Sequence, residues 1–419
     1  MTSGGVQVVE LVRRVVERHS DESVGQLVGI AGAGVALIVG PFVFRSGGTP
    51  LAGEVSVAAV TSVLVAVLGG AAFATAYVSV ARHTSRWRTR PVLWRIADAL
   101  ALTIAAASIA AMAALAAYTL FQRMFQGLLL GRVAATLMAA VTVAAGCYLL
   151  TAIAHGMSSS GVAVLLVAFL GAGVVASTLS ADNPGWWQSN FSALGISTSS
   201  SASAFNFTVV VAGIVLTTLA DYLSADLVRW PSLGRRTVLT VRIVLTVIGL
   251  TLIGLGVVPV NLSRLVHDIF AVTAIVGFGL LILAAPALLR TLPSTFIVTT
   301  WIFGGLMVVV VLLWRVGRAY NFTAVELLSV LIIFAWLALF ARTVASGPAP
   351  VHEETAAVAA VESSVVPSME QPVETAEQVE EGTDPRPAFG WGTGSLALAV
   401  AAGAVLGAVA TAYLHRRTR

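Results

Sequence analysis

Long apolar runs alternate with short polar connections along most of this chain. Each run of about 20 residues can cross a hydrocarbon core of roughly 30 Å as a helix. We expect helices because lipid cannot form hydrogen bonds with backbone N–H and C=O groups, and a helix pairs these groups internally. The pattern predicts eleven spans, at residues 26–46, 55–80, 96–121, 133–155, 160–180, 203–226, 237–258, 267–289, 296–315, 323–344 and 394–414.

These spans predict an all-α, polytopic membrane protein with about ten or eleven transmembrane helices. In residues 1–25, apolar and charged side chains fall on opposite faces of a helix, which is typical of an amphipathic helix on the cytoplasmic membrane surface. We expect the remainder to form a four-helix membrane part (26–156), a six-helix membrane unit (160–344), a disordered acidic tail (345–392) and a C-terminal hydrophobic helix with a basic end (393–419).

Composition agrees with a membrane protein. Hydrophobic residues make up 58% of the chain and charged residues 11%, whereas soluble domains contain about 25% charged residues. The net charge of +4 is unevenly distributed. Residues 346–391 carry nine acids and one arginine, so this segment is acidic and the rest of the chain is basic. The sequence contains no lysine, and Ala, Val and Gly are abundant. This composition indicates a GC-rich bacterial genome.

The arginines predict the orientation, because cytoplasmic loops of membrane proteins hold the excess of positive charge. We expect a plasma-membrane protein with a cytoplasmic N-terminus. This orientation places the arginine cluster at residues 82–95 and most other arginines in the cytoplasm. Eleven spans would leave the basic C-terminal end outside, so the side of the C-terminus stays open.

Three polar loops of the six-helix unit face the predicted outer surface, at residues 183–195, 258–271 and 315–326. Polar residues that persist in a membrane protein commonly mark its function. We therefore expect these loops to form one polar cap. Its candidate binding residues are Trp186, Trp187, Asn190, Arg264, His267, Asp268, Tyr320 and Glu326.

The motifs WWQSNFSALG, FNFTVVVAGIVLTT and GLGVVPVNLSRLVHDIFA occur in order within this unit. Over residues 160–344 the chain resembles the bacterial membrane family called domain of unknown function 998. The resemblance implies a six-helix fold, adds Ser192 to the candidate cap and brings no established reaction. It directs attention to Trp187, Asn190, Ser192, Gly195, Asn206, Pro259 and His267.

Several cap residues also have a structural interpretation. Trp186 and Trp187 fit an interfacial aromatic belt. The order Thr323 to Glu326 matches a capping box, in which Glu326 would bond to backbone N–H groups. Since acids favour helix N-termini, His267 and Asp268 could be an interfacial histidine beside a cap.

Charged residues near the cytoplasmic ends of two consecutive spans favour a structural ion pair. Asp221 and Asp226 lie near the end of the sixth span, and Arg242 lies near the start of the seventh. The two spans are neighbours in sequence, so these side chains can meet.

The motifs of other classes of chemistry are missing. The single Cys147 lies in an apolar span, and no helix carries a pair of histidines, or a glutamate and a histidine, with metal-ligand spacing. The spacings that are missing are His-x-x-x-His and Glu-x-x-His. We expect no metal, no cofactor and no nucleic-acid partner. Gly403 and Gly407 have the small-xxx-small spacing of close helix packing and could support a homo-oligomer.

Three functions remain open. The first is binding or moving a lipid or small amphipathic molecule through the outer cap, with membrane lipids as partners. The second is a membrane enzyme that acts on an outer-leaflet lipid, with His267 as candidate general base. The third is a scaffold that recruits partners through its acidic tail.

The orientation predicts opposite reactivity for two engineered cysteines. A cysteine at Ser189 should react with an impermeant thiol reagent added outside the cell, and one at Ser85 should not. The reverse pattern would move the polar cap into the cytoplasm.

Overall fold

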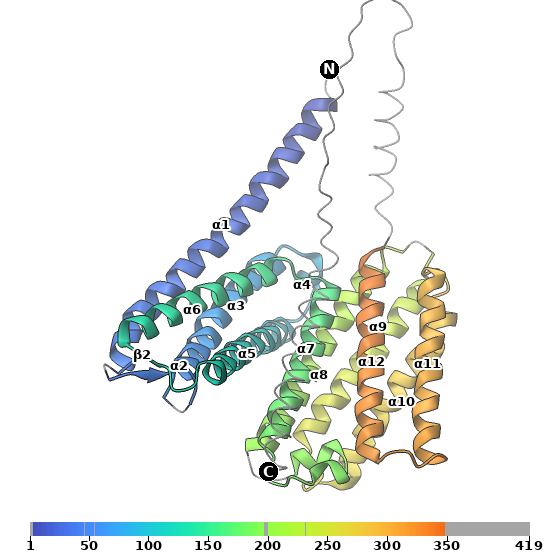
Figure 1. Cartoon of the computed structure of the whole chain (residues 1–419). Coiled ribbons are helices and arrows are strands. Elements are labelled where there is room, and N and C mark those ends of the chain that lie inside the picture. The colour runs from blue at the N-terminus through green and yellow to red at the C-terminus, as the bar shows by residue number, and fades with distance from the viewer. Residues whose placement is uncertain (1–2, 46, 54, 197–199, 231, 348–419) are drawn as a thin grey trace, which may run out of the picture. The chain divides into compact units, whose positions relative to one another are not determined.

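The computed structural model describes residues 3–45, 47–53, 55–196, 200–230 and 232–347 (Figure 1). Helices dominate this part of the chain, with one short strand pair between β1 (Thr49–Pro50) and β2 (Leu129–Leu130). The helices before residue 156 are α1 (Ser3–Val43), α2 (Val57–Leu64), the π-helical turn η1 (Val65–Gly69), α3 (Gly70–Ala81), α4 (Ser85–Thr89), α5 (Val92–Met124) and α6 (Arg132–His155).

The second part begins with α7. Its helices are α7 (Ser159–Leu179), the 3-10 turns η2 (Trp186–Gln188) and η3 (Phe191–Gly195), α8 (Ser200–Leu227), α9 (Arg235–Val257), α10 (Arg264–Leu288), α11 (Ser294–Arg315) and α12 (Phe322–Ala345).

Ten helices in the described residues are long and apolar enough to cross a membrane, with α2, η1 and α3 forming one of them. The predicted all-α polytopic class is therefore confirmed, and the ten span ends agree with the sequence pattern to within a few residues. The predicted eleventh span, the acidic tail, and Gly403 and Gly407 lie outside the described residues.

The N-terminal helix differs from the expectation at one point. We expected an amphipathic helix over residues 1–25 and a separate span after it, but α1 continues from Ser3 to Val43. The candidate span within it is Glu22–Val43. No proline interrupts the chain before Pro41, so the backbone has no reason to break between the charged and the apolar segment.

Glycines allow two helix pairs to approach closely. Helix α1 packs along α6. An added Cβ on α1 would lie 3.0 Å from the Ala144 carbonyl oxygen at Gly29 and 2.8 Å from the Cys147 sulfur at Gly32. On α8, a Cβ at Gly213 would lie 2.5 Å from the Gly249 carbonyl oxygen of α9. In lipid, no hydrophobic effect drives helices together, and small residues let their backbones approach closely enough for van der Waals packing to do so.

The two membrane parts share one apolar core. Its members include Phe73 and Leu102 from the first part and Leu166, Leu216 and Trp336 from the second, all fully buried or nearly so. In contrast, α10 and α11 keep many large apolar side chains exposed. Exposed apolar faces on spanning helices are the surfaces that contact lipid.

The close contact of α8 with α9 generates a stability prediction. Gly213→Ala should lower the free energy of unfolding by about 1–3 kcal/mol, because the new methyl group meets a backbone carbonyl that cannot rotate away. Thermal unfolding of the purified protein in detergent measures the change.

Gly279→Ala is the matched control, because nothing lies within 4 Å of a Cβ at this helical glycine. It should leave stability unchanged or raise it slightly, since alanine favours a helix. Equal stability of both variants would contradict the close packing of α8 and α9.

Candidate functional site

The outer loop, residues 183–195, folds into two 3-10 turns that its own asparagines stabilise. The Asn183 side-chain oxygen accepts a hydrogen bond from the Gly185 N–H at 2.9 Å, closing the turn around Pro184. The Asn190 side chain caps η3 by accepting from the Ala193 N–H, also at 2.9 Å. Asn190 therefore shapes the loop itself.

Two side chains of α12 bind the backbone of the outer loop. The Glu326 carboxylate accepts from the Phe191 N–H at 2.7 Å, and the Asn321 side-chain amide donates to the Trp187 carbonyl oxygen at 2.6 Å. Asn321 also caps α12 by accepting from the Ala324 N–H at 3.1 Å. The middle of the loop is thus fixed to the start of α12.

The predicted capping box at Thr323 is wrong. Asn321 is the N-cap of α12, two residues earlier, so Thr323 already lies inside the helix. Glu326 bonds to a backbone N–H as expected, but that N–H belongs to Phe191 of the outer loop. The local pattern could not reveal this partner, which is 135 residues away in sequence.

His267 of α10 connects the outer loop to the end of α9. Its side chain is buried, with 4% of the residue exposed. The ring Nδ1 lies 2.9 Å from the Val258 carbonyl oxygen, and Nε2 lies 3.0 Å from the Ser192 hydroxyl. Because a carbonyl oxygen only accepts, Nδ1 carries a proton, and in the neutral ring Nε2 accepts from Ser192.

Three other predicted cap residues point elsewhere. The Asp268 side chain is 58% exposed and lies 3.7 Å from Arg264, one helical turn away and 83% exposed. Asp268 therefore pairs with Arg264 and makes no hydrogen bond to His267. The Tyr320 hydroxyl donates to the Val310 carbonyl oxygen of α11 at 2.6 Å.

Apolar side chains of the outer loop pack together with those of α8 and α9. Trp186 packs on Phe191 with 5.3 Å between ring centroids, while Trp187 is half exposed. We call this group of side chains the apolar layer, and its members are Ala181, Trp186, Phe191, Leu194, Phe205, Val209, Leu252 and Leu255. The loop thus places polar contacts to α10 and α12 beside a group of apolar side chains.

Asn206 and Gly195 fix the far end of the outer loop to α8. The Asn206 side-chain amide donates to the Gly195 carbonyl oxygen at 3.2 Å. An added Cβ at Gly195 would lie 2.5 Å from the Asn206 side-chain oxygen, so only glycine fits without displacement. Both residues were singled out by the family resemblance, and the structure brings them together.

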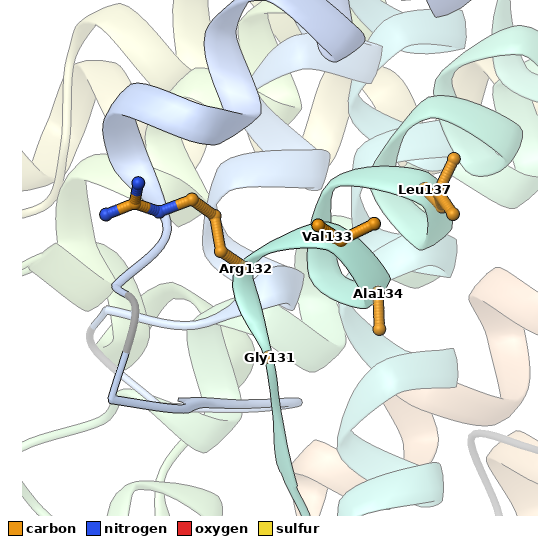
Figure 2. Close-up of a pocket in the computed structure, with 5 residues that line it drawn as sticks. All are labelled: Gly131, Arg132, Val133, Ala134 and Leu137. Carbon is orange, nitrogen blue, oxygen red and sulfur yellow. The ribbon is translucent and has the colours of Figure 1, made fainter.

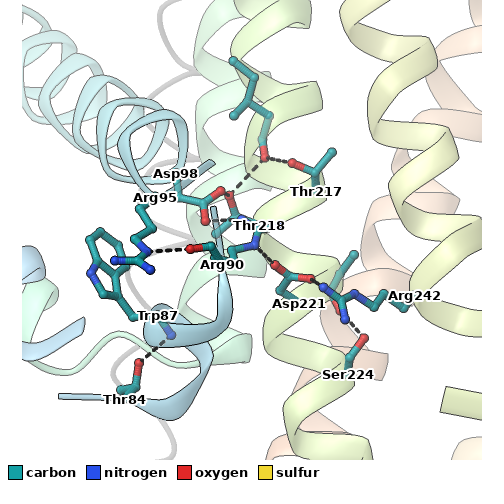
Figure 3. Close-up of polar contacts among 12 residues, drawn as sticks. Thr84, Trp87, Arg90, Arg95, Asp98, Thr217, Thr218, Asp221, Ser224 and Arg242 are labelled. Atoms are coloured by element: carbon teal, nitrogen blue, oxygen red, sulfur yellow. Dashed lines mark hydrogen bonds and ion pairs between the residues drawn. The ribbon is translucent and has the colours of Figure 1, made fainter. Parts of the chain in front are cut away.

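A second polar site joins the two membrane parts near the predicted cytoplasmic ends of the helices (Figure 3). The Arg90 guanidinium binds both Asp98 of α5 and Asp221 of α8. Arg242 of α9 binds Asp221 at 2.8 Å, and the Thr218 hydroxyl donates to Asp98 at 2.7 Å. We call these five residues the ionic cluster. Both aspartates are almost completely buried.

The predicted ion pair between Asp221 and Arg242 is confirmed. Asp226 instead binds Arg229 and the Ser159 hydroxyl. Sequence reasoning missed the contribution of Arg90, which comes from the loop before α5. The available signal was Asp98, an acid within a predicted span, because a charge there requires a partner.

The structure also has a shallow surface depression of about 600 Å³ at the start of α6 (Figure 2). Its lining residues are Gly131, Arg132, Val133, Ala134 and Leu137. The Arg132 guanidinium Nε donates to the Phe44 carbonyl oxygen at 3.2 Å. This depression carries one charged group on an apolar surface and includes no predicted site residue.

No group of three or more His, Cys, Asp or Glu side chains in the described ranges could hold a metal ion.

Removing Arg90 tests the ionic cluster. Arg90→Gln should lower the free energy of unfolding by about 3–5 kcal/mol, because it leaves two buried carboxylates without their shared cation. Arg264→Gln removes an arginine from an exposed ion pair and should change stability by less than about 1 kcal/mol. Similar thermal unfolding of the two variants would argue against a strongly buried cluster.

Comparison with protein-family models, with curated proteins and with solved structures gives no match to this chain. The resemblance of residues 160–344 to the domain of unknown function 998 family stays a prediction.

Proposed function

We propose that this protein binds or moves a lipid or small amphipathic molecule, with the outer loop acting as a lid over the binding site. The single observation that carries the proposal is the arrangement of the outer loop. Its apolar side chains pack on those of α8 and α9 within the apolar layer, and His267 and Glu326 hold it through contacts to Ser192 and the Phe191 N–H.

The two halves of such a site suit the two halves of an amphipathic ligand. When the loop moves away, the Glu326 carboxylate and the His267 Nε2 lose their loop partners and can bond to a polar headgroup. Phe205, Val209 and Leu252 offer apolar contact to a tail. Binding sites for small molecules are commonly apolar with a few polar groups that set orientation.

The enzyme alternative has less support. A catalytic histidine base is commonly oriented by a third group such as a carboxylate, but the Nδ1 of His267 bonds to the backbone carbonyl oxygen of Val258. The neighbouring carboxylate of Asp268 is exposed and pairs with Arg264. The scaffold alternative depends on the acidic tail, which lies outside the described residues.

We further propose that the membrane is a bacterial plasma membrane and that the N-terminus is cytoplasmic. The arginine distribution supports this orientation. The outer loop would then face away from the cytoplasm, where it could receive molecules from the outer leaflet.

Two conservative substitutions test the headgroup contacts. Glu326→Gln keeps a side-chain oxygen for the Phe191 N–H but removes the charge, and His267→Gln keeps a donor and an acceptor. Both should reduce the amphiphile that copurifies with the protein by about tenfold or more, since hydrogen bonds to charged groups contribute about 1.5–3 kcal/mol. Solvent extraction and mass spectrometry of equal amounts of folded protein measure this.

Asp268→Asn is the matched control, because it removes an exposed acid next to His267 in sequence. It should retain the wild-type amount of amphiphile. Full retention by the Glu326 and His267 variants, or loss only together with thermal unfolding, would refute the proposed site.

A further inference from the structure

We propose that an arginine-rich corner between α3 and α5 binds the headgroup of an anionic phospholipid. We define the basic corner as Arg82, Arg88 and Arg95 together with the exposed apolar start of α5. It lies on the membrane face opposite the outer loop in the predicted topology, so it is a separate site from the one proposed above.

The corner carries positive charge that no acid in the described part of the chain pairs with. Residues 82–97 contain five arginines and no acid. Arg90 already binds Asp98 and Asp221 in the ionic cluster. The other described arginines of the corner form no ion pair with an acid among the residues that the structure describes; these are Arg82, Arg88 and Arg95. Arginine is the residue that matches phosphate geometry best, because its planar guanidinium donates two parallel hydrogen bonds.

Backbone contacts hold part of this charge in place. The Arg95 guanidinium donates to the carbonyl oxygens of Arg90 at 2.7 Å and of Arg88 at 3.0 Å. Carbonyl oxygens carry no net charge, so these contacts do not neutralise the guanidinium. Trp87 of the short helix α4 packs edge-on against Tyr77 of α3, with ring centroids 6.0 Å apart. The loop that presents the arginines is therefore anchored at both sides.

Apolar side chains next to the arginines distinguish a lipid from a soluble anion. Leu93 is 76% exposed, and Val92 and Ile96 are also mostly exposed, at the start of the spanning helix α5. Trp94 is partly exposed and lies 5.8 Å from the Arg90 guanidinium. Tryptophan and arginine at a helix end mark the headgroup level of a bilayer. A phosphate with attached acyl chains can contact both surfaces at once.

The test compares lipid binding by three forms of the full-length protein. Native mass spectrometry in detergent measures binding of dioleoyl-phosphatidylglycerol and, separately, of dioleoyl-phosphatidylcholine. The double variant Arg82→Gln/Arg88→Gln should bind phosphatidylglycerol about 30-fold more weakly, because each arginine near a membrane surface contributes about 1 kcal/mol. Phosphatidylcholine binding should stay the same.

Arg235→Gln/Arg236→Gln is the matched control, because it removes two exposed arginines from the same predicted face. It should retain phosphatidylglycerol binding. Equal weakening in both double variants would show diffuse charge attraction and overturn the proposal. Displacement of phosphatidylglycerol by inorganic phosphate at equal concentration would indicate a soluble-anion site and overturn it as well.

Discussion

The hydrocarbon core of a membrane offers no hydrogen bonds, so the buried carboxylates of this protein must find partners within it. Asp98 and Asp221 share Arg90, which joins the first membrane part to the second. Glu326 accepts from the outer loop and joins α12 to a segment far away in sequence. Carboxylates therefore connect separate elements at both ends of the helices, where Arg90 binds two buried aspartates and the Phe191 N–H binds the partly buried Glu326.

The physics of helix length made most of the fold predictable. A run of apolar residues long enough to cross a bilayer has few alternatives to a helix, so the ten described spans follow from the sequence. The pair of Asp221 with Arg242 was also predictable, because the two residues lie at similar depth on consecutive helices. In both cases the relevant neighbours are close in sequence.

The site was less predictable because its contacts are long-range. The loops predicted to converge do so through Ser192, His267 and Glu326. The sequence pattern could not show that His267 is buried, since Ser192, which bonds to its ring, is 75 residues away. The pattern also assigned Glu326 to a cap on its own helix, whereas its partner in the structure is the Phe191 N–H of the outer loop. Local patterns report helix ends well and tertiary contacts poorly.

The central claim is that the outer loop is a lid held by His267 and Glu326. Hydrogen–deuterium exchange of a peptide covering residues 183–195 tests it most directly. In ligand-free wild-type protein the Phe191 and Ala193 amides should exchange slowly, because each donates to a side chain, and Glu326→Ala should speed exchange at Phe191 much more than at Ala193. Rapid exchange of the whole loop in the wild type, or no change at Phe191 in the variant, would contradict the account.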